Sequence, residues 1–133
     1  MNLNKRDYNE VLKYIERGRD LLHESVRFRE EGRAEKFSES LWGSLVSVLN
    51  AYALVKGARL TSHKEVRDFV RQLSSELQDN RLYETFRRAE ALHANFYHGF
   101  MDINDIVLDL EEIENAVVKI IGLVEKELRM LER

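Results

Sequence analysis

Apolar residues recur every three or four positions along most of the chain, and this period constrains the fold more than any other feature. Such spacing places side chains on one face of an α-helix, whereas a half-buried strand alternates at every second residue. Strand-like alternation is absent from the sequence. Proline is also absent and the six glycines stand singly, so extended linkers and low-complexity segments are not expected. The period predicts one all-α domain over residues 1–133, a five-helix up-and-down bundle.

The helix boundaries follow from local start and stop signals. Gly32, Gly57 and Gly99 are typical C-terminal stops, and Ser62 with Glu65 forms a capping box at the start of a helix. The predicted helices are 4–31, 34–56, a helix between Ser62 and Asp79, 81–98, and a last helix that begins between 102 and 104.

The second predicted helix is expected at the centre of the bundle. Its segment LWGSLVSVLNAYALV is apolar on nearly every side, which is typical of a helix covered all round. Gly43, Ser44 and Ser47 are small enough to let a neighbouring helix come close. Trp42 is expected in the core.

Composition excludes several kinds of site. Without cysteine there is no disulfide, no thiolate nucleophile and no cysteine-bound zinc. Charged residues make up 34% of the chain in mixed signs with a formal net charge of −3, so the whole surface is not a basic coat for nucleic acid. No stretch reaches the roughly 18 uninterrupted apolar residues of a membrane span. The N-terminus lacks the apolar core of a signal peptide, and a cytoplasmic protein without a membrane partner is expected.

No metal or other cofactor is expected. His93 and His98 are five positions apart, which does not place two ligands on one helical face. Glu90 and His93 match the Glu-x-x-His pattern of diiron bundles once, but a second copy is missing.

Residues suited to chemistry gather in the stretch RLYETFRRAEALHANFYHG, residues 81–99. It holds His93 and His98, which are two of the four histidines in the chain. At 3.6 residues per turn one face carries Leu82, Phe86, Ala89, His93 and Phe96. An imidazole therefore lies within an apolar stripe, and Phe96 is expected in the core. The remaining histidines, His23 and His63, have no partner at ligand spacing and are expected at the surface.

The helix order and the run AEALHANFYHGFM resemble the HEPN superfamily and, within it, the archaeal PaREP-type branch, where a similar His-x-Asn-Phe-Tyr run leads into the last helix. The resemblance covers roughly residues 5–128 by helix order and 89–101 at motif level. It implies a homodimer whose faces include the motif helices. Many HEPN domains are metal-independent ribonucleases of toxin–antitoxin and defence systems, whereas others are non-catalytic companions of nucleotidyltransferases.

Two registers fit the family motif, which is an arginine, usually a polar residue, a few more residues and a histidine. Arg88 and His93 have an allowed spacing, with Ala89 where a polar residue is usual. Alignment on the following aromatic instead places His93 at the arginine and His98 at the histidine. The sequence leaves both registers open.

Metal-independent RNA cleavage needs a base for the 2′-hydroxyl proton, an acid for the leaving oxygen and a cation near the phosphate. Imidazole suits both proton transfers near neutral pH, and guanidinium suits the phosphate. The candidate catalytic residues are Arg88, His93 and His98. The candidate substrate-binding residues are Arg87, Asn95 and Tyr97.

Helical geometry separates these candidates within one chain. Five positions turn a helix by about 140°, so His93 shares a face with neither Arg88 nor His98. Arg88 does share a face with Asn95, and Arg87 with His98. Catalysis by this set therefore requires a two-fold axis that brings two copies together.

Structural roles compete with each functional assignment. His93 also suits a hydrogen-bonded core or interface position, His98 can contact the last carbonyls of its helix, and the arginines can pair with Glu84 and Glu90. The sequence leaves open a dimeric ribonuclease acting on RNA, a non-catalytic module that binds a nucleotide or a nucleotidyltransferase-type partner, and a plain helical interaction protein.

Overall fold

The computed structural model describes residues 3–131, and most of them lie in five helices. The helices are α1 (Lys5–Glu30), α2 (Ala34–Val55), α3 (His63–Glu76), α4 (Asn80–His98) and α5 (Ile103–Leu131). The predicted all-α bundle of five helices is confirmed, and every predicted boundary lies within three residues of the observed one.

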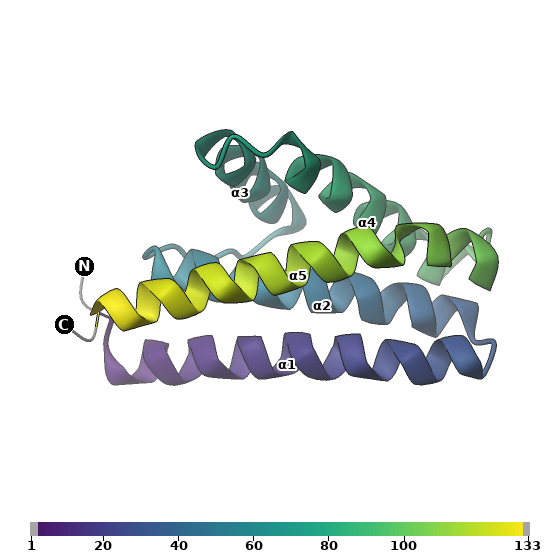
Figure 1. The fold of residues 1–133 in the computed structure, drawn as a ribbon, viewed down its shortest axis with the longest axis horizontal. Helices are drawn as coiled ribbons and strands as arrows, with labels where there is room; N and C mark the ends of the chain where they lie inside the picture. The colour runs from purple at the N-terminus through teal and green to yellow at the C-terminus, as the bar shows by residue number, and fades with distance from the viewer. Residues whose placement is uncertain (1–2, 132–133) are drawn as a thin grey trace.

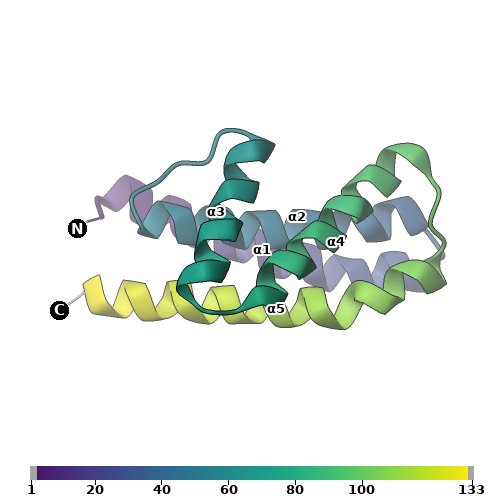
Figure 2. The same cartoon turned by 90° about the horizontal axis from the view of Figure 1, so that it is seen from above.

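Helices α1, α2 and α5 lie side by side as three long rods, and α3 and α4 form a hairpin across them (Figure 1). Helix α2 is central because it packs against all four others, whereas α1 packs mainly on α2 and only slightly on α5. The loop of residues 56–62 runs back along α2 before α3 begins (Figure 2). This return brings the first residue of α3 beside the earlier half of α2, which decides the geometry of the candidate site.

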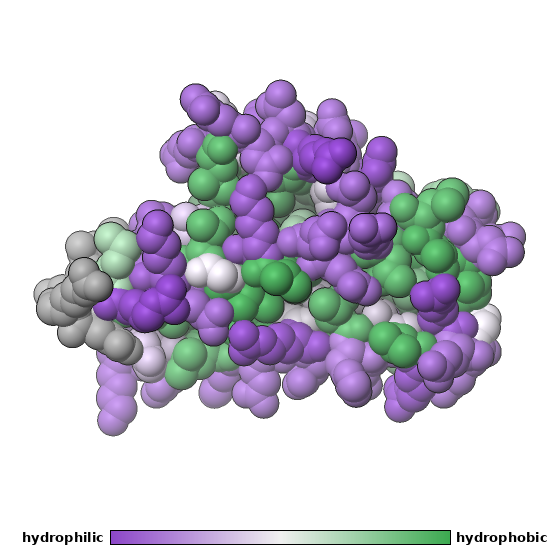
Figure 3. Space-filling model, in the orientation of Figure 1, coloured by the Kyte–Doolittle hydropathy of each residue, from purple (hydrophilic) through white to green (hydrophobic). Residues whose placement is uncertain are grey.

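Polar side chains cover much of the face shown in Figure 3, while apolar ones gather at the end where α4 meets α5. The large exposed apolar residues near this end are Phe96, Phe100 and Leu108. Among residues 3–131, no helix combines the length and apolar character needed to cross a membrane.

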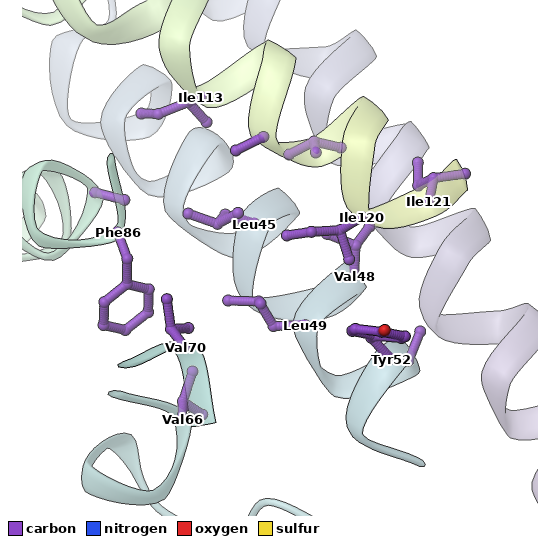
Figure 4. Packing of buried hydrophobic residues seen from close by; sticks show 14 of the residues in the cluster. Leu45, Val48, Leu49, Tyr52, Val66, Val70, Phe86, Ile113, Ile120 and Ile121 are labelled. Atoms are coloured by element: carbon purple, nitrogen blue, oxygen red, sulfur yellow. The ribbon is translucent and has the colours of Figure 1, made fainter. Parts of the chain in front are cut away.

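The core forms around α2, as the sequence predicts for residues 41–55 (Figure 4). Leu45 and Leu49 of α2 are fully buried, and Val70, Phe86 and Ile113 from the three following helices are fully buried in the same cluster. Each large aliphatic side chain that leaves water contributes about 1.5–3 kcal/mol. This shared core holds the α3–α4 hairpin against the long helices.

Small residues let α1 and α2 approach closely. The Ser44 hydroxyl donates a hydrogen bond to the Gly18 carbonyl at 2.6 Å, and the Ser47 hydroxyl donates to the Tyr14 carbonyl at 3.0 Å. A Cβ atom on Gly18 would lie 2.6 Å from Cγ1 of Val48. The predicted role of the two serines is confirmed, and Gly18 on α1 lies opposite them.

The start of α3 follows the predicted capping box with one difference. Ser62 Oγ accepts a hydrogen bond from the Glu65 amide at 3.1 Å, as expected. Glu65 reaches one residue further back than predicted, because its carboxylate accepts from both the amide and the hydroxyl of Thr61 at 2.7 Å each. These bonds lower the pKa of Glu65 and fix the residue where α3 begins.

Candidate functional site

Two imidazole rings contact one indole at the junction of α2, α3 and α4. The centroid of the Trp42 ring lies 5.1 Å from the centroid of the His63 ring and 5.0 Å from that of the His93 ring. The plane of His93 is tilted by only 24° from that of Trp42, so these two rings stack. The two imidazoles lie 6.0 Å apart.

Helical spacing and the returning loop together create this arrangement. Glu39 and Trp42 are three positions apart on α2, and His63 is the first residue of α3. Glu90 and His93 are three positions apart on α4, so they face the same side. Three helices therefore each contribute residues to one small area.

Each imidazole is held by its own carboxylate. His93 Nδ1 lies 3.0 Å from Glu39 Oε2, and His63 Nε2 lies 2.7 Å from Glu90 Oε2. Neither His93 Nε2 nor His63 Nδ1 bonds to any residue within 3–131, and neither is a buried, unpaired atom. A carboxylate on one ring nitrogen orients an imidazole and leaves the other nitrogen for proton transfer.

Glu90 links this pair to two arginines. Its side chain is only 11% exposed, and Oε2 accepts hydrogen bonds from Arg67 Nε at 3.0 Å and Nη2 at 2.7 Å. Arg87 Nε lies 3.0 Å from Oε1 as an ion pair, although the angle does not suit a hydrogen bond. The hydrogen bond to Glu90 raises the pKa of Arg67. The Glu90 carboxylate thus faces two permanent cations and an imidazole.

A third arginine, Arg71, follows Arg67 along α3. Its guanidinium donates to the hydroxyl of Tyr83 at 2.9 Å, and Arg87 reaches the same oxygen at 3.5 Å. The hydrogen bonds from Arg87 and Arg71 lower the pKa of Tyr83. We call Arg67, Arg71 and Arg87 the arginine cluster.

The structure does not bring Arg88 and His98 to this place. Arg88 Nε lies 3.9 Å from Asp109 Oδ1 on α5, whereas His93 bonds to α2. Burial raises the pKa of Asp109, and the nearby guanidinium opposes that effect. His98 is exposed as the last residue of α4 and bonds to no side chain within residues 3–131.

Asn95 has a structural role. It is fully buried, its Nδ2 donates to Ser38 Oγ at 3.0 Å, and its Oδ1 accepts from the Met101 amide at 2.6 Å. Its carbonyl also accepts from the amide of Gly99, which adopts φ +61° and ends α4. Asn95 therefore fixes the end of α4 to α2, and it presents no free side-chain atom to a substrate.

The two aromatic residues near His93, Phe96 and Tyr97, are both exposed. Tyr97 is 68% exposed, and its ring packs edge-on against His93 at 5.3 Å. The prediction that Phe96 is a core residue is wrong, because its side chain is 38% exposed. The buried side of α4 continues through Leu92 and Asn95 instead of through His93 and Phe96.

Sequence reasoning missed Glu39 and the pairing of His63. His63 does lie at the surface, as predicted, but its contact with Trp42 depends on the path of residues 56–62. The available signal was the capping box, since it fixed His63 in the first turn of α3 beside Ser62. Within residues 3–131, no group of three or more His, Asp or Glu side chains is arranged to hold a metal ion.

The family model described as the archaeal PaREP1/PaREP8 family matches residues 13–117. The chain belongs to this family. The PaREP1/PaREP8 match spans all of α2, α3 and α4, so both imidazoles and their carboxylates lie within it. No curated protein is similar enough to this chain to count as a match.

Proposed function

We propose that this PaREP1/PaREP8 protein is a metal-independent, HEPN-like endoribonuclease in which His63 and His93 carry the two proton transfers. The main support is that both imidazole rings pack on Trp42 with their centroids 6.0 Å apart, and that each ring bonds to its own carboxylate. At this separation one phosphodiester group can lie within hydrogen-bonding reach of both rings.

The chemistry balances with these groups alone. One imidazole takes the proton of the 2′-hydroxyl as that oxygen attacks phosphorus. The bond from phosphorus to the 5′ oxygen then breaks, and the other imidazole, which begins protonated, gives its proton to the leaving oxygen. The products are a 2′,3′-cyclic phosphate and a 5′-hydroxyl end. No oxidant or second substrate is consumed.

The arginine cluster supplies the positive charge that this reaction requires. Negative charge grows on the phosphate oxygens in the transition state, and fixed cations beside them stabilise it. Arg67 and Arg87 are both oriented by Glu90, so their positions are set before substrate arrives.

This proposal differs from the dimeric site expected from the sequence. His63 replaces His98 as the second imidazole, and the arginine cluster replaces Arg88. Because His63 and His93 belong to the same chain, the acid and the base do not depend on a second copy.

The direct test is cleavage of a single-stranded RNA in the presence of EDTA, with the ends identified by mass spectrometry. Wild-type protein should produce 2′,3′-cyclic phosphate ends. His63→Ala and His93→Ala should each lower the rate by roughly 10²–10⁴-fold, the usual contribution of a general acid or base. His98→Ala is the matched control and should retain the wild-type rate. Cleavage that survives both His63→Ala and His93→Ala would rule out the assignment.

A non-catalytic nucleotide-binding module is the second candidate. The exposed ring of Tyr97 beside His93 favours it, because exposed aromatic rings bind unpaired bases by stacking. This candidate predicts that RNA binds and remains intact in the same assay.

A further inference from the structure

A separate small groove lies between α1, α2 and the end of α4. Its volume is about 190 Å³, and its lining includes Arg17, Phe28, Lys36, Glu39 and Phe96. This volume is below the roughly 300–1,000 Å³ of pockets that hold drug-sized ligands. The groove therefore suits one ring system rather than a whole dinucleotide.

The groove has two cations available for an anion. Neither Arg17 nor Lys36 is within ion-pair distance of a carboxylate among residues 3–131, although both line the groove. The neighbouring arginines of this region are engaged, since Arg27 pairs with Glu24 and Glu31, and Arg33 pairs with Glu31. Arg17 and Lys36 thus remain the cations that can receive a phosphate there.

Glu39 is the one acidic residue that lines the groove among residues 3–131, and it is already bonded to a histidine. The carboxylate of Glu39 bonds to His93 Nδ1 at 3.0 Å, so its charge is shared with the imidazole. The same residue connects the groove to the histidine pair, because it borders one and holds the other.

Aromatic rings form a continuous row from the histidine pair to the groove. Centroid distances are 5.0 Å from Trp42 to His93, 5.3 Å from His93 to Tyr97, and 5.1 Å from Tyr97 to Phe96. Phe96 then lines the groove together with Phe28. A row of rings beside cations is typical of surfaces that bind single-stranded nucleic acid, since bases stack and phosphates pair with the cations.

We propose that this groove binds the nucleotide next to the scissile bond of a single-stranded RNA, with its base against Phe96 and Phe28 and its two flanking phosphates paired with Arg17 and Lys36. The direction of the strand toward the histidine pair rests on the proposed ribonuclease function. Binding of the nucleotide itself does not. The substrate is single-stranded because a base within a duplex cannot leave its stack to enter the groove.

The test measures binding without cleavage. A fluorescein-labelled oligonucleotide with 2′-O-methyl groups at every position lacks the attacking hydroxyl, and its affinity is read by fluorescence anisotropy over a range of salt concentrations. Arg17→Ala and Lys36→Ala should each weaken binding several-fold. Each should also reduce the slope of log affinity against log salt by about 0.7, the value for one phosphate contact on a single strand. Phe96→Leu should weaken binding by roughly five-fold or more without changing the slope.

Matched controls separate the groove from general charge and general aromaticity. Arg29→Ala removes an exposed cation of α1 outside the groove lining, and Phe100→Leu removes an exposed aromatic outside it. Both should bind like wild type. Equal losses in Arg29→Ala and Arg17→Ala, or no binding by wild type, would overturn the groove assignment.

The outcomes also separate this inference from the proposed function. If RNA is cleaved in a manner that depends on His63 while the groove variants bind normally, the groove assignment fails and the ribonuclease stands. If RNA is never cleaved but binding depends on Arg17, Lys36 and Phe96, the ribonuclease fails and the groove stands.

Discussion

Glu90 is the residue on which the site depends most at the scale of single side chains. Its carboxylate accepts from His63 and Arg67 and pairs with Arg87, with only 11% of the side chain exposed. Replacing a largely buried, shared charge leaves several donors without their acceptor. Both the fold and the orientation of His63 are therefore sensitive to this position.

Glu90→Gln should lower the free energy of unfolding by about 1.5–3 kcal/mol, the range for hydrogen bonds to a charged group. It should also lower kcat for RNA cleavage more than it raises KM, because His63 loses the carboxylate that orients it. Urea unfolding and steady-state kinetics measure the two effects. Glu84→Gln, an exposed acid one and a half turns earlier on α4, is the control and should change neither. A stable Glu90→Gln protein with wild-type kcat would show that His63 does not need this partner.

Asp79 provides a residue-scale prediction about pH. The side chain caps α4 by accepting from the Arg81 amide at 3.1 Å, and it pairs with Lys119 of α5. The hydrogen bond from Lys119 lowers the pKa of Asp79 from its ordinary value of 3.8. The charged carboxylate therefore stabilises the folded state above pH 3.8, and this contribution is lost as the pH falls through the lower, folded-state pKa.

Asp79→Asn keeps a capping side chain but removes the charge. It should lower the free energy of unfolding near neutral pH by about 0.5–1 kcal/mol, since the pair is partly exposed. The difference from wild type should shrink as the pH falls below 3.8. Urea unfolding at several pH values measures it, with Asp20→Asn, an exposed acid of α1, as the control. A difference that stays constant with pH would contradict the ion pair.

At the scale of helices, the seam between α1 and α2 tolerates little added volume. A Cβ atom on Gly18 would lie 2.6 Å from Val48 Cγ1, while a Cβ atom on Gly122 of α5 would meet no heavy atom within 4 Å. Both glycines lie inside helices, so both gain helix propensity on change to alanine. Only Gly18 also meets an obstacle.

Gly18→Ala should therefore destabilise the protein by about 1–2 kcal/mol, because overpacking outweighs the gain in propensity. Gly122→Ala should stabilise it by about 0.5–1 kcal/mol. Thermal unfolding followed by circular dichroism compares the two. The added change Val48→Ala should recover part of the loss in Gly18→Ala, since it removes the clashing methyl group. Equal effects at both glycines would mean that the two helices are not in close contact.

The helices themselves were predictable because their signals are local. Periodicity, glycine stops and the Ser62 cap act within a few residues, and the structure reproduces their boundaries. The site was predictable only in part. His93, Tyr97 and Arg87 lie there, but His63 reaches Trp42 through the path of residues 56–62, which no local signal encodes. Asn95 shows the converse, since a residue expected to bind substrate proved to be fully buried.

At the scale of the whole molecule, the face formed by α1 and α5 offers a surface for a second copy. A groove of about 550 Å³ separates the two helices, with Val26 and Val118 more than half exposed along it. Arg19 on its α1 edge pairs with Glu125 on its α5 edge at 3.5 Å, and Glu114 also lines the α5 edge. A two-fold axis could bring the exposed valines of two copies together, so we propose that a homodimer forms here.

Val118→Glu should convert the proposed dimer into a monomer, because it would introduce a charge into the proposed apolar contact. Light scattering coupled to gel filtration measures the molar mass. The control is Leu108→Glu, which changes an exposed residue outside the groove and should leave the molar mass unchanged. The neighbouring Val107 is not used, because it packs on the core. A dimer that persists in Val118→Glu would place the interface elsewhere.

The whole-molecule question that matters most is whether the two imidazoles act within one chain. Equal amounts of His63→Ala and His93→Ala proteins are mixed, subunit exchange is confirmed by native mass spectrometry, and the rate of RNA cleavage in EDTA is measured. A site built from one chain predicts that the mixture cleaves no faster than either variant alone. If each site were shared between two chains, random pairing of subunits would leave about a quarter of the sites intact. Recovery of about a quarter of the wild-type rate would therefore contradict the pairing of His63 with His93 in a single chain.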